Sequence, residues 1–183
     1  MAYSNKIISN LKTRQEIKFL KTTRDTGGRL LEMESTYHPK SVQPAPHYHP
    51  FQDEVFSVIS GELTVLIDGR RWTLLPGDSI HLPAKKRHAM WNSSEKKTVV
   101  NWKVSPALDT EYFLETAMGI SASDKSGEAG KPGILQVVLL ARKYADVFRL
   151  SKPPFAVQRV FFYLLAPIAR LLGYRATYPE FID

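Results

Sequence analysis

The stretch "PHYHPFQDEVFSVISGEL", residues 46–63, contains two of the chain's five histidines, and a single residue separates them. Side chains at alternate positions of a β-strand point to the same face, so His47 and His49 project together, roughly 7 Å apart along the chain. Glu54 opens the strand that follows. If that strand folds back beside the histidine segment, the Glu54 carboxylate lies close to both imidazoles. Two imidazoles and a carboxylate suit a divalent transition metal. The stretch therefore predicts a metal site on one face of a β-sheet.

A second segment, "PGDSIHLPAKKRHAMWN", residues 76–92, supplies another imidazole. A turn at residues 76–78 leads into one strand, and His88 opens the next. A rolled-up sheet can bring residues from distant parts of the chain together, so we expect His88 to be the fourth ligand. Zinc, manganese, iron, nickel and copper all accept three histidines and one carboxylate, so the site is predicted to hold one divalent transition metal.

The first 104 residues consist of short segments rich in β-branched and aromatic residues, and turn residues separate many of them. The predicted strands are residues 17–23, 29–38, 54–60, 62–69, 71–75, 79–83, 88–92 and 97–104. A parallel sheet would need helices between its strands, and no helical pattern occurs there. Many short strands with frequent turns therefore predict a β-sandwich or β-barrel.

The pattern becomes helical after residue 106. Residues 107–119 predict a short helix, and residues 134–150 predict a second one because their polar side chains fall on one side of a helical wheel. Residues 155–174 predict a third helix, which Pro167 is expected to kink.

These patterns divide the chain into three parts. Residues 1–106 are expected to form the barrel, with its core at about residues 30–105. Residues 107–133 are expected to form a short helix and a linker rich in serine, glycine and charge. Residues 134–183 are expected to form a helical C-terminal extension.

The two histidine segments resemble the cupins, whose first motif is G(x)5HxH(x)3–4E(x)6G and whose second motif is G(x)5PxG(x)2H(x)3N. The later part of the first motif is matched by His47, His49, Glu54 and Gly61. The second motif is matched at its spacing by Gly77, Pro83, His88 and Asn92. Seven or eight fixed positions make this resemblance far more specific than an isolated HxH. It implies a mainly β fold, a double-stranded β-helix or jelly-roll barrel, with the metal inside and α-helices following at the C-terminus.

Two positions depart from these motifs. Ser41 stands where the first motif has glycine, and Lys85 stands where the second motif has glycine between proline and histidine. A lysine tolerates a positive φ poorly, so we expect the loop at residues 84–87 to take a different shape.

The resemblance to cupins implies a metal-dependent enzyme, dioxygenase- or isomerase-like, that acts on a small organic substrate. A six-coordinate ion held by four side chains keeps about two positions open for a substrate or water. Glu54 could then leave the metal and accept a proton, which makes it the candidate catalytic residue. Tyr48, Phe56, Met90 and Asn92 lie beside the ligands and could line a substrate pocket, although such residues more often belong to the core.

Two other classes of function fit the same residues. One is a non-catalytic binding module, in which the barrel captures a small molecule and the helices signal to a partner or dock to a membrane. The other is a purely structural protein in which the extension is the functional part.

Positive charge is concentrated in the C-terminal third. Residues 131–175 carry 8 Lys+Arg and 1 Asp+Glu, whereas residues 1–130 carry 17 and 15. The segment 155–174 is apolar nearly all round, with Arg159 and Arg170 as its charges, so it must be buried somewhere. The sequence favours packing on the barrel or in a homodimer over peripheral contact with a membrane surface. A span is disfavoured because a proline and two arginines interrupt the segment.

The remaining composition bounds the environment. The positively charged C-terminal third contains no motif that is known to bind in a nucleic-acid groove, so nucleic-acid binding is not expected. The chain has no cysteine, which excludes disulfides and thiolate ligands. Its first residues have no apolar run like that of a signal peptide. We therefore expect a cytoplasmic protein.

Overall fold

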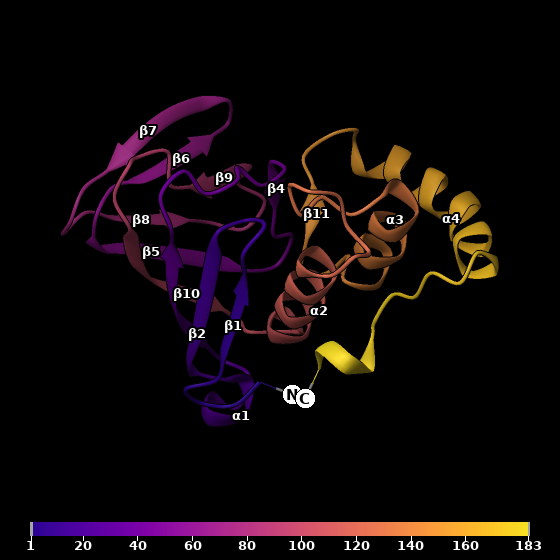
Figure 1. Ribbon diagram of the computed structural model, residues 1–183, viewed down its shortest axis with the longest axis horizontal. Helices are drawn as coiled ribbons and strands as arrows, with labels where there is room; N and C mark the ends of the chain where they lie inside the picture. The colour runs from indigo at the N-terminus through magenta and orange to yellow at the C-terminus, as the bar shows by residue number, and fades with distance from the viewer. Residues whose placement is uncertain (1, 183) are drawn as a thin grey trace.

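A six-stranded and a five-stranded antiparallel sheet enclose the core of the molecule, and the helices that follow residue 105 lie to one side of them (Figure 1). The computed structural model describes residues 2–182. The six-stranded sheet contains, in spatial order, β1 (Ile7–Asn10), β2 (Gln15–Lys21), β3 (Leu31–Tyr37), β10 (Thr98–Ser105), β5 (Asp53–Ser60) and β8 (Ser79–Leu82). The five-stranded sheet contains β11 (Arg149–Leu150), β4 (His47–Tyr48), β9 (His88–Trp91), β6 (Leu63–Ile67) and β7 (Arg70–Leu74).

Alternation of side chains explains why these segments form sheets around a core. In β3 every second residue is buried and the residues between are half-buried, as expected for a strand with one face inward. Leu31 and Met33 of this strand meet Leu63 and Val65 of β6, from the opposite sheet, in one apolar cluster. The predicted jelly-roll barrel is confirmed, and the strands missed from the sequence are β1 and β11.

The helices are α1 (Thr23–Thr26), α2 (Thr110–Ala122), α3 (Ile134–Lys143) and α4 (Phe155–Leu171), with a final 3-10 turn at Pro179–Phe181. Polar contacts fix α2 to the barrel. Lys6 Nζ donates to Glu115 Oε1 over 2.6 Å in a buried ion pair, and the backbone N–H of Thr23 donates to Glu111 Oε2 over 3.0 Å. The predicted mainly β fold with C-terminal helices is therefore present.

The prediction of one helix over residues 134–150 is wrong in its second half. Helix α3 ends at Lys143, and Arg149–Leu150 form β11, which pairs antiparallel with β4. The backbone N–H of Ser151 extends this pairing by donating to Pro46 O over 2.9 Å. Helical periodicity is a weak prior that a tertiary partner can override, and here the open edge of β4 supplies that partner.

The two departures from the motif glycines are accommodated without disturbing the barrel. Lys85 has φ of 69°, in the left-handed region that favours glycine, so the lysine adopts the backbone conformation that it was expected to tolerate poorly. Its N–H donates to His49 O over 2.7 Å, which holds the loop in place. Ser41 is buried, and its hydroxyl accepts the backbone N–H of Asn92 over 2.9 Å.

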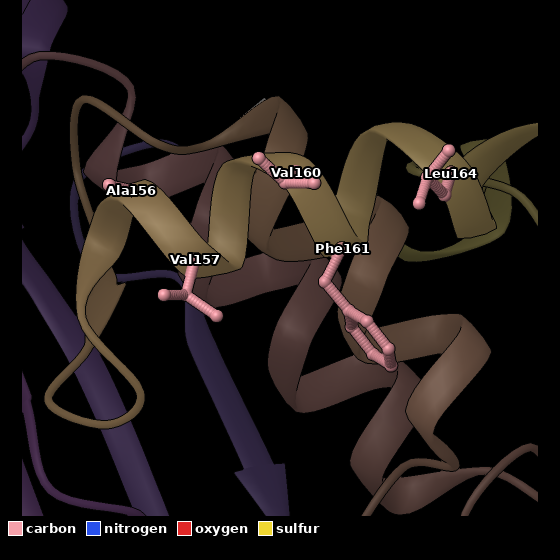
Figure 2. Close-up of a pocket in the computed structure, with 5 residues that line it drawn as sticks. All are labelled: Ala156, Val157, Val160, Phe161 and Leu164. Carbon is pink, nitrogen blue, oxygen red and sulfur yellow. The ribbon is translucent and has the colours of Figure 1, made fainter.

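Helix α4 lies at the outer edge of the molecule, beside α3 (Figures 1 and 2). It continues through Pro167 and ends close to the predicted boundary. One stripe of α4 packs on α3, and most of its other side chains are exposed. Within residues 2–182, no helix has both the length and the hydropathy needed to cross a bilayer.

Candidate metal centre

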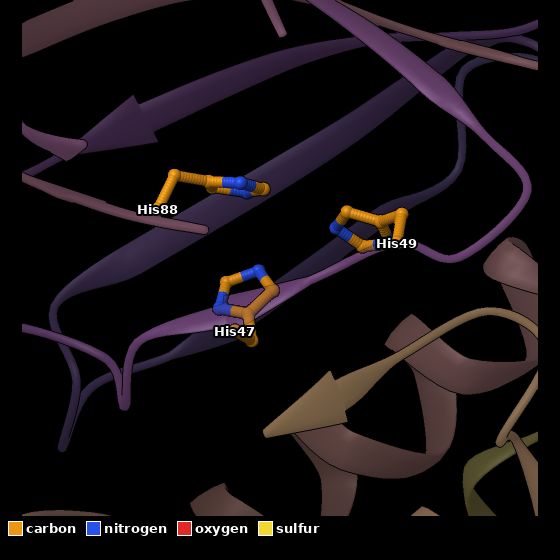
Figure 3. Close-up of side chains that lie close together, drawn as sticks. All are labelled: His47, His49 and His88. Atoms are coloured by element: carbon orange, nitrogen blue, oxygen red, sulfur yellow. The ribbon is translucent and has the colours of Figure 1, made fainter. Parts of the chain in front are cut away.

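Strand pairing brings three histidines from two parts of the chain to one point. His47 lies in β4 and His88 opens β9, and the two residues are direct partners across these antiparallel strands. His49 follows two positions after His47. One ring nitrogen from each histidine lies within 4.8 Å of those of the other two, and Figure 3 shows the three rings turned toward one another. This arrangement brings together the three histidines predicted from the sequence.

Each imidazole is held through its Nδ1 atom by a backbone carbonyl. His47 Nδ1 lies 2.9 Å from Ala45 O, and His88 Nδ1 lies 2.9 Å from Lys86 O. His49 Nδ1 lies 2.5 Å from Val147 O. A carbonyl oxygen can only accept a hydrogen bond, so the proton belongs on Nδ1 and the Nε2 lone pair is left free. Histidines that hold metals are commonly oriented by such contacts.

Glu54 completes the cluster from the opposite sheet, at the second position of β5. Its side chain is 1% exposed, and Oε2 lies 3.0 Å from His88 Nε2 and 3.3 Å from His49 Nε2. Trp102 Nε1 donates a hydrogen bond to the other oxygen, Oε1, over 3.0 Å. Within the described residues, His49 Nε2 and Glu54 Oε2 are both buried and make no hydrogen bond.

Leaving such atoms without a hydrogen bond in the protein interior is costly, and a cation between them would satisfy both. The donor set of three imidazoles and one carboxylate also matches the preferences of divalent transition metals. The three histidines, with the Glu54 carboxylate beside His49 and His88, therefore suit a metal ion.

The pKa values in the cluster follow from burial and from the single carboxylate. Burial alone would raise the pKa of Glu54, but the facing imidazoles, His49 above all, lower it to about 2. Burial lowers the pKa of His47 well below its ordinary value and lowers that of His49. Burial would also lower the pKa of His88, but the Glu54 carboxylate raises it. An ionised carboxylate and neutral imidazoles are the forms that bind metals.

The C-terminal extension forms part of this site. Strand β11 pairs with β4 so that Leu150 lies opposite His47, and Val147 supplies the carbonyl that holds His49. The ring of Phe148 lies 4.7 Å from that of His47, and Phe113 of α2 stacks behind it at 4.9 Å. Sequence reasoning missed these contacts. No residue type could have marked Val147, because every residue has a backbone carbonyl.

The residues predicted to line a substrate pocket differ in burial and in the face of the sheet to which they point. Phe56 shares the buried face of Glu54 on β5 and stacks on Trp102 with ring centroids 5.3 Å apart. Met90 is buried in β9. Tyr48 alternates with His47 on β4 and therefore points to the opposite face, away from the ligands.

The prediction that Asn92 lines the pocket is wrong. Its Nδ2 donates to the backbone carbonyls of Tyr37, His38 and Lys96, and its Oδ1 accepts from Ser94. All of its hydrogen-bonding groups are thus used in closing a turn beside β9.

Comparison with known proteins agrees with this geometry. The family model "Cupin domain" matches residues 33–103, which contain both histidine segments and Glu54. This part of the chain is a cupin domain. The match covers β3 to most of β10 and leaves the C-terminal extension outside.

Two relatives of known name resemble the chain. Quercetin 2,3-dioxygenase of Bacillus subtilis (strain 168) is 31% identical over 90 residues, which cover 49% of this chain and 26% of that protein. An oxidoreductase of Arthrobotrys oligospora is 31% identical over 152 residues, which cover 75% of this chain and 59% of that protein. The chain thus spans less than two thirds of the length of either relative.

Among solved structures, KdgF from Halomonas sp. is 20% identical to this chain with a TM-score of 0.49. The alignment covers 57% of this chain and 89% of that one.

Proposed function

We propose that this cupin holds one divalent transition metal through His47, His49, Glu54 and His88. The observation that carries the proposal is the pair of buried atoms without hydrogen bonds, His49 Nε2 and Glu54 Oε2, beside two further imidazoles whose Nδ1 atoms are already engaged. Zinc, manganese, iron, nickel and copper all accept this donor set.

We further propose that the metal-loaded protein is an enzyme acting on a small organic substrate. When bound, such an ion serves as a Lewis acid toward an oxygen atom of the substrate. The names of the relatives, a 2,3-dioxygenase and an oxidoreductase, support a redox reaction over an isomerisation, and the first name supports the use of oxygen. The half-buried Phe148 ring beside His47 supports a substrate with an apolar part.

The residues around the cluster have separate roles in this proposal. The three histidines bind through Nε2, and the carbonyls at Ala45, Lys86 and Val147 keep their rings oriented. The surrounding barrel excludes water, which strengthens the electrostatic interactions of the site.

We propose that Glu54 acts mainly as a metal ligand and that a role as proton acceptor is secondary. A general base works best when its pKa lies near the working pH, and the pKa of Glu54 is about 2. Its role as proton acceptor is tested by Glu54→Gln, which removes the negative charge and keeps the shape. Unchanged turnover in that variant would eliminate the catalytic role.

The enzymatic proposal is tested with purified protein loaded with each of the five metals. Oxygen uptake and product formation are measured across phenolic, diketone and sugar substrates. We expect turnover with one metal and one substrate class, and its loss in His88→Ala. The matched control is His81→Ala, which removes an exposed histidine that pairs with Asp53 on the surface. Equal turnover in His88→Ala would contradict the proposal.

The alternative is a non-catalytic binding cupin whose C-terminal helices mediate dimerisation or membrane-surface docking. It is favoured by the large apolar area that α4 leaves exposed, since catalysis in the barrel does not require it. Tight binding of a substrate analogue by metal-loaded protein, without turnover in any assay, would support this alternative.

A further inference from the structure

Helix α4 has two opposite faces, and only one of them is covered. Gln158, Phe162, Ala166 and Ala169 form a buried stripe, and the apolar members of this stripe pack with side chains of α3. These positions recur every three to four residues, as expected for one side of an α-helix. The packing on α3 therefore uses a single stripe of α4.

The opposite side of α4 is apolar and exposed. We define its outer face by six residues, Val157, Val160, Phe161, Leu164, Ile168 and Leu171. Their exposure runs from 48% at Phe161 to 88% at Leu171. Figure 2 shows four of them, with Ala156, on successive turns of the helix, where they line a shallow hollow of about 470 Å³. A contiguous apolar surface of this kind marks an interaction site in a folded protein.

Positive charges run along one edge of this outer face. On a helical wheel, Arg159 and Arg170 fall together between the buried stripe and the outer face, with Tyr163 beside them. Arg142 of α3 adds to this edge, because its guanidinium lies 5.7 Å from the Tyr163 ring. Residues 147–179 contain no aspartate or glutamate, so no carboxylate of this segment offsets the charge.

We propose that the outer face of α4 docks on an anionic lipid bilayer, with the helix lying in the plane of the surface. The apolar side chains would enter the boundary between headgroups and acyl chains, while Arg159 and Arg170 reach lipid phosphates. Tyrosine beside such a face suits the interface, because its ring is apolar and its hydroxyl is polar. The proposal is independent of the metal site.

Charge complementarity distinguishes the bilayer from a second copy of the chain. A second copy would present the same arginines and no carboxylate from residues 147–179, so the edges of two such faces would repel. An anionic bilayer supplies the opposite charge along the whole edge. This favours a lipid surface over the contact with the barrel or with a second copy that the sequence alone favoured for this helix.

The first test is sedimentation of the full-length protein with vesicles of phosphatidylcholine alone or mixed with phosphatidylglycerol. We expect the wild type to pellet with the mixed vesicles and to remain largely in solution with phosphatidylcholine. Leu164→Asp, in the centre of the outer face, should abolish pelleting. Leu75→Asp is the matched control, because Leu75 is a similarly exposed leucine on the barrel, and it should pellet like the wild type.

The second test reverses charge at the edge. Arg159→Glu/Arg170→Glu should weaken binding to the mixed vesicles by roughly tenfold or more. Lys96→Glu/Lys97→Glu makes the same change in charge at exposed positions of the barrel and should leave binding close to that of the wild type. Thermal unfolding of every variant checks that the fold is intact.

Three results would overturn the proposal. The first is wild-type protein that stays in solution with both kinds of vesicle. The second is pelleting that Leu164→Asp and the double arginine variant leave unchanged. The third is a dimer in sedimentation velocity that Leu164→Asp converts to monomer, because a second copy would then cover the outer face.

Discussion

The barrel and the C-terminal extension bury their apolar residues in different ways. The barrel closes on itself, and residues such as Leu31 and Val65 have no exposed surface. The extension covers one stripe of α4 and leaves Leu164 and Leu171 in solvent. The barrel therefore buries its apolar residues within the fold, with β11 of the extension as part of one sheet, whereas α4 carries apolar surface that folding alone does not explain.

The two regions nevertheless share the histidine cluster. All four proposed ligands come from the barrel, but Val147 and Phe148 of the extension hold His49 and cover His47. The extension is therefore both a support for the site and, on its other side, a candidate docking surface.

The largest effect is expected from breaking the barrel at Gly61. This residue has φ of +77°, and a Cβ there would lie 2.4 Å from Lys97 O, closer than real Cβ contacts allow. Gly61→Ala should lower the free energy of unfolding by about 3 kcal/mol or more, measured by urea denaturation. Gly69→Ala is the matched control, because Gly69 also has a positive φ but open space around it, and it should cost about 1 kcal/mol. Equal losses in the two variants would contradict the steric argument.

An intermediate effect is expected where the extension meets the site. Phe148→Ala removes the ring that contacts His47 and Phe113, so it should cost about 2 kcal/mol of stability and weaken metal binding by about tenfold. Competition with a chelator measures the metal affinity. Phe161→Ala removes an aromatic ring from the same extension at the outer face of α4 and should leave that affinity unchanged. If both variants bound metal like the wild type, the extension would not support the site.

A smaller effect on the site is expected from Trp102→Phe. This change removes the indole N–H that donates to Glu54 Oε1 but keeps an aromatic ring to stack on Phe56. Metal affinity should fall by up to about tenfold, with the barrel still folded. Trp72→Phe, at an exposed position of β7, is the control and should have no effect on affinity. A wild-type affinity in Trp102→Phe would show that this hydrogen bond does not orient the carboxylate.

The smallest effect on stability is expected at the outer face of α4. Leu164→Asp should change the free energy of unfolding by less than about 0.5 kcal/mol, because the leucine is exposed in the folded chain. Ala166→Asp places the same carboxylate in the buried stripe and should cost at least about 2 kcal/mol. A large loss in Leu164→Asp would mean that this face is already buried in the protein in solution.

The same contrast explains what could be predicted from the sequence. The sequence predicted the barrel, and it predicted that four side chains come together: His47, His49, Glu54 and His88. Motif spacing and the alternation of side chains depend only on residue types, which the sequence gives. The contact of Val147 was not, because a backbone carbonyl has no signature in the sequence. Strand β11 was also missed, since two residues pair there only because β4 offers an open edge.

Single positions show the limits of local rules. The left-handed backbone of Lys85 contradicts its residue preference, and its N–H bond to His49 O offsets part of the conformational cost. Asn92 lies at the predicted motif position, but its amide is committed to turn carbonyls that the sequence did not identify as partners.

Elemental analysis with metal titration tests whether four side chains of the barrel hold one metal ion. We expect one tightly bound divalent ion per chain in the wild type and in His81→Ala. We expect an affinity reduced by about a hundredfold in His88→Ala. Wild-type protein that retains none of the five metals, or His88→Ala that binds as tightly as the wild type, would contradict the account.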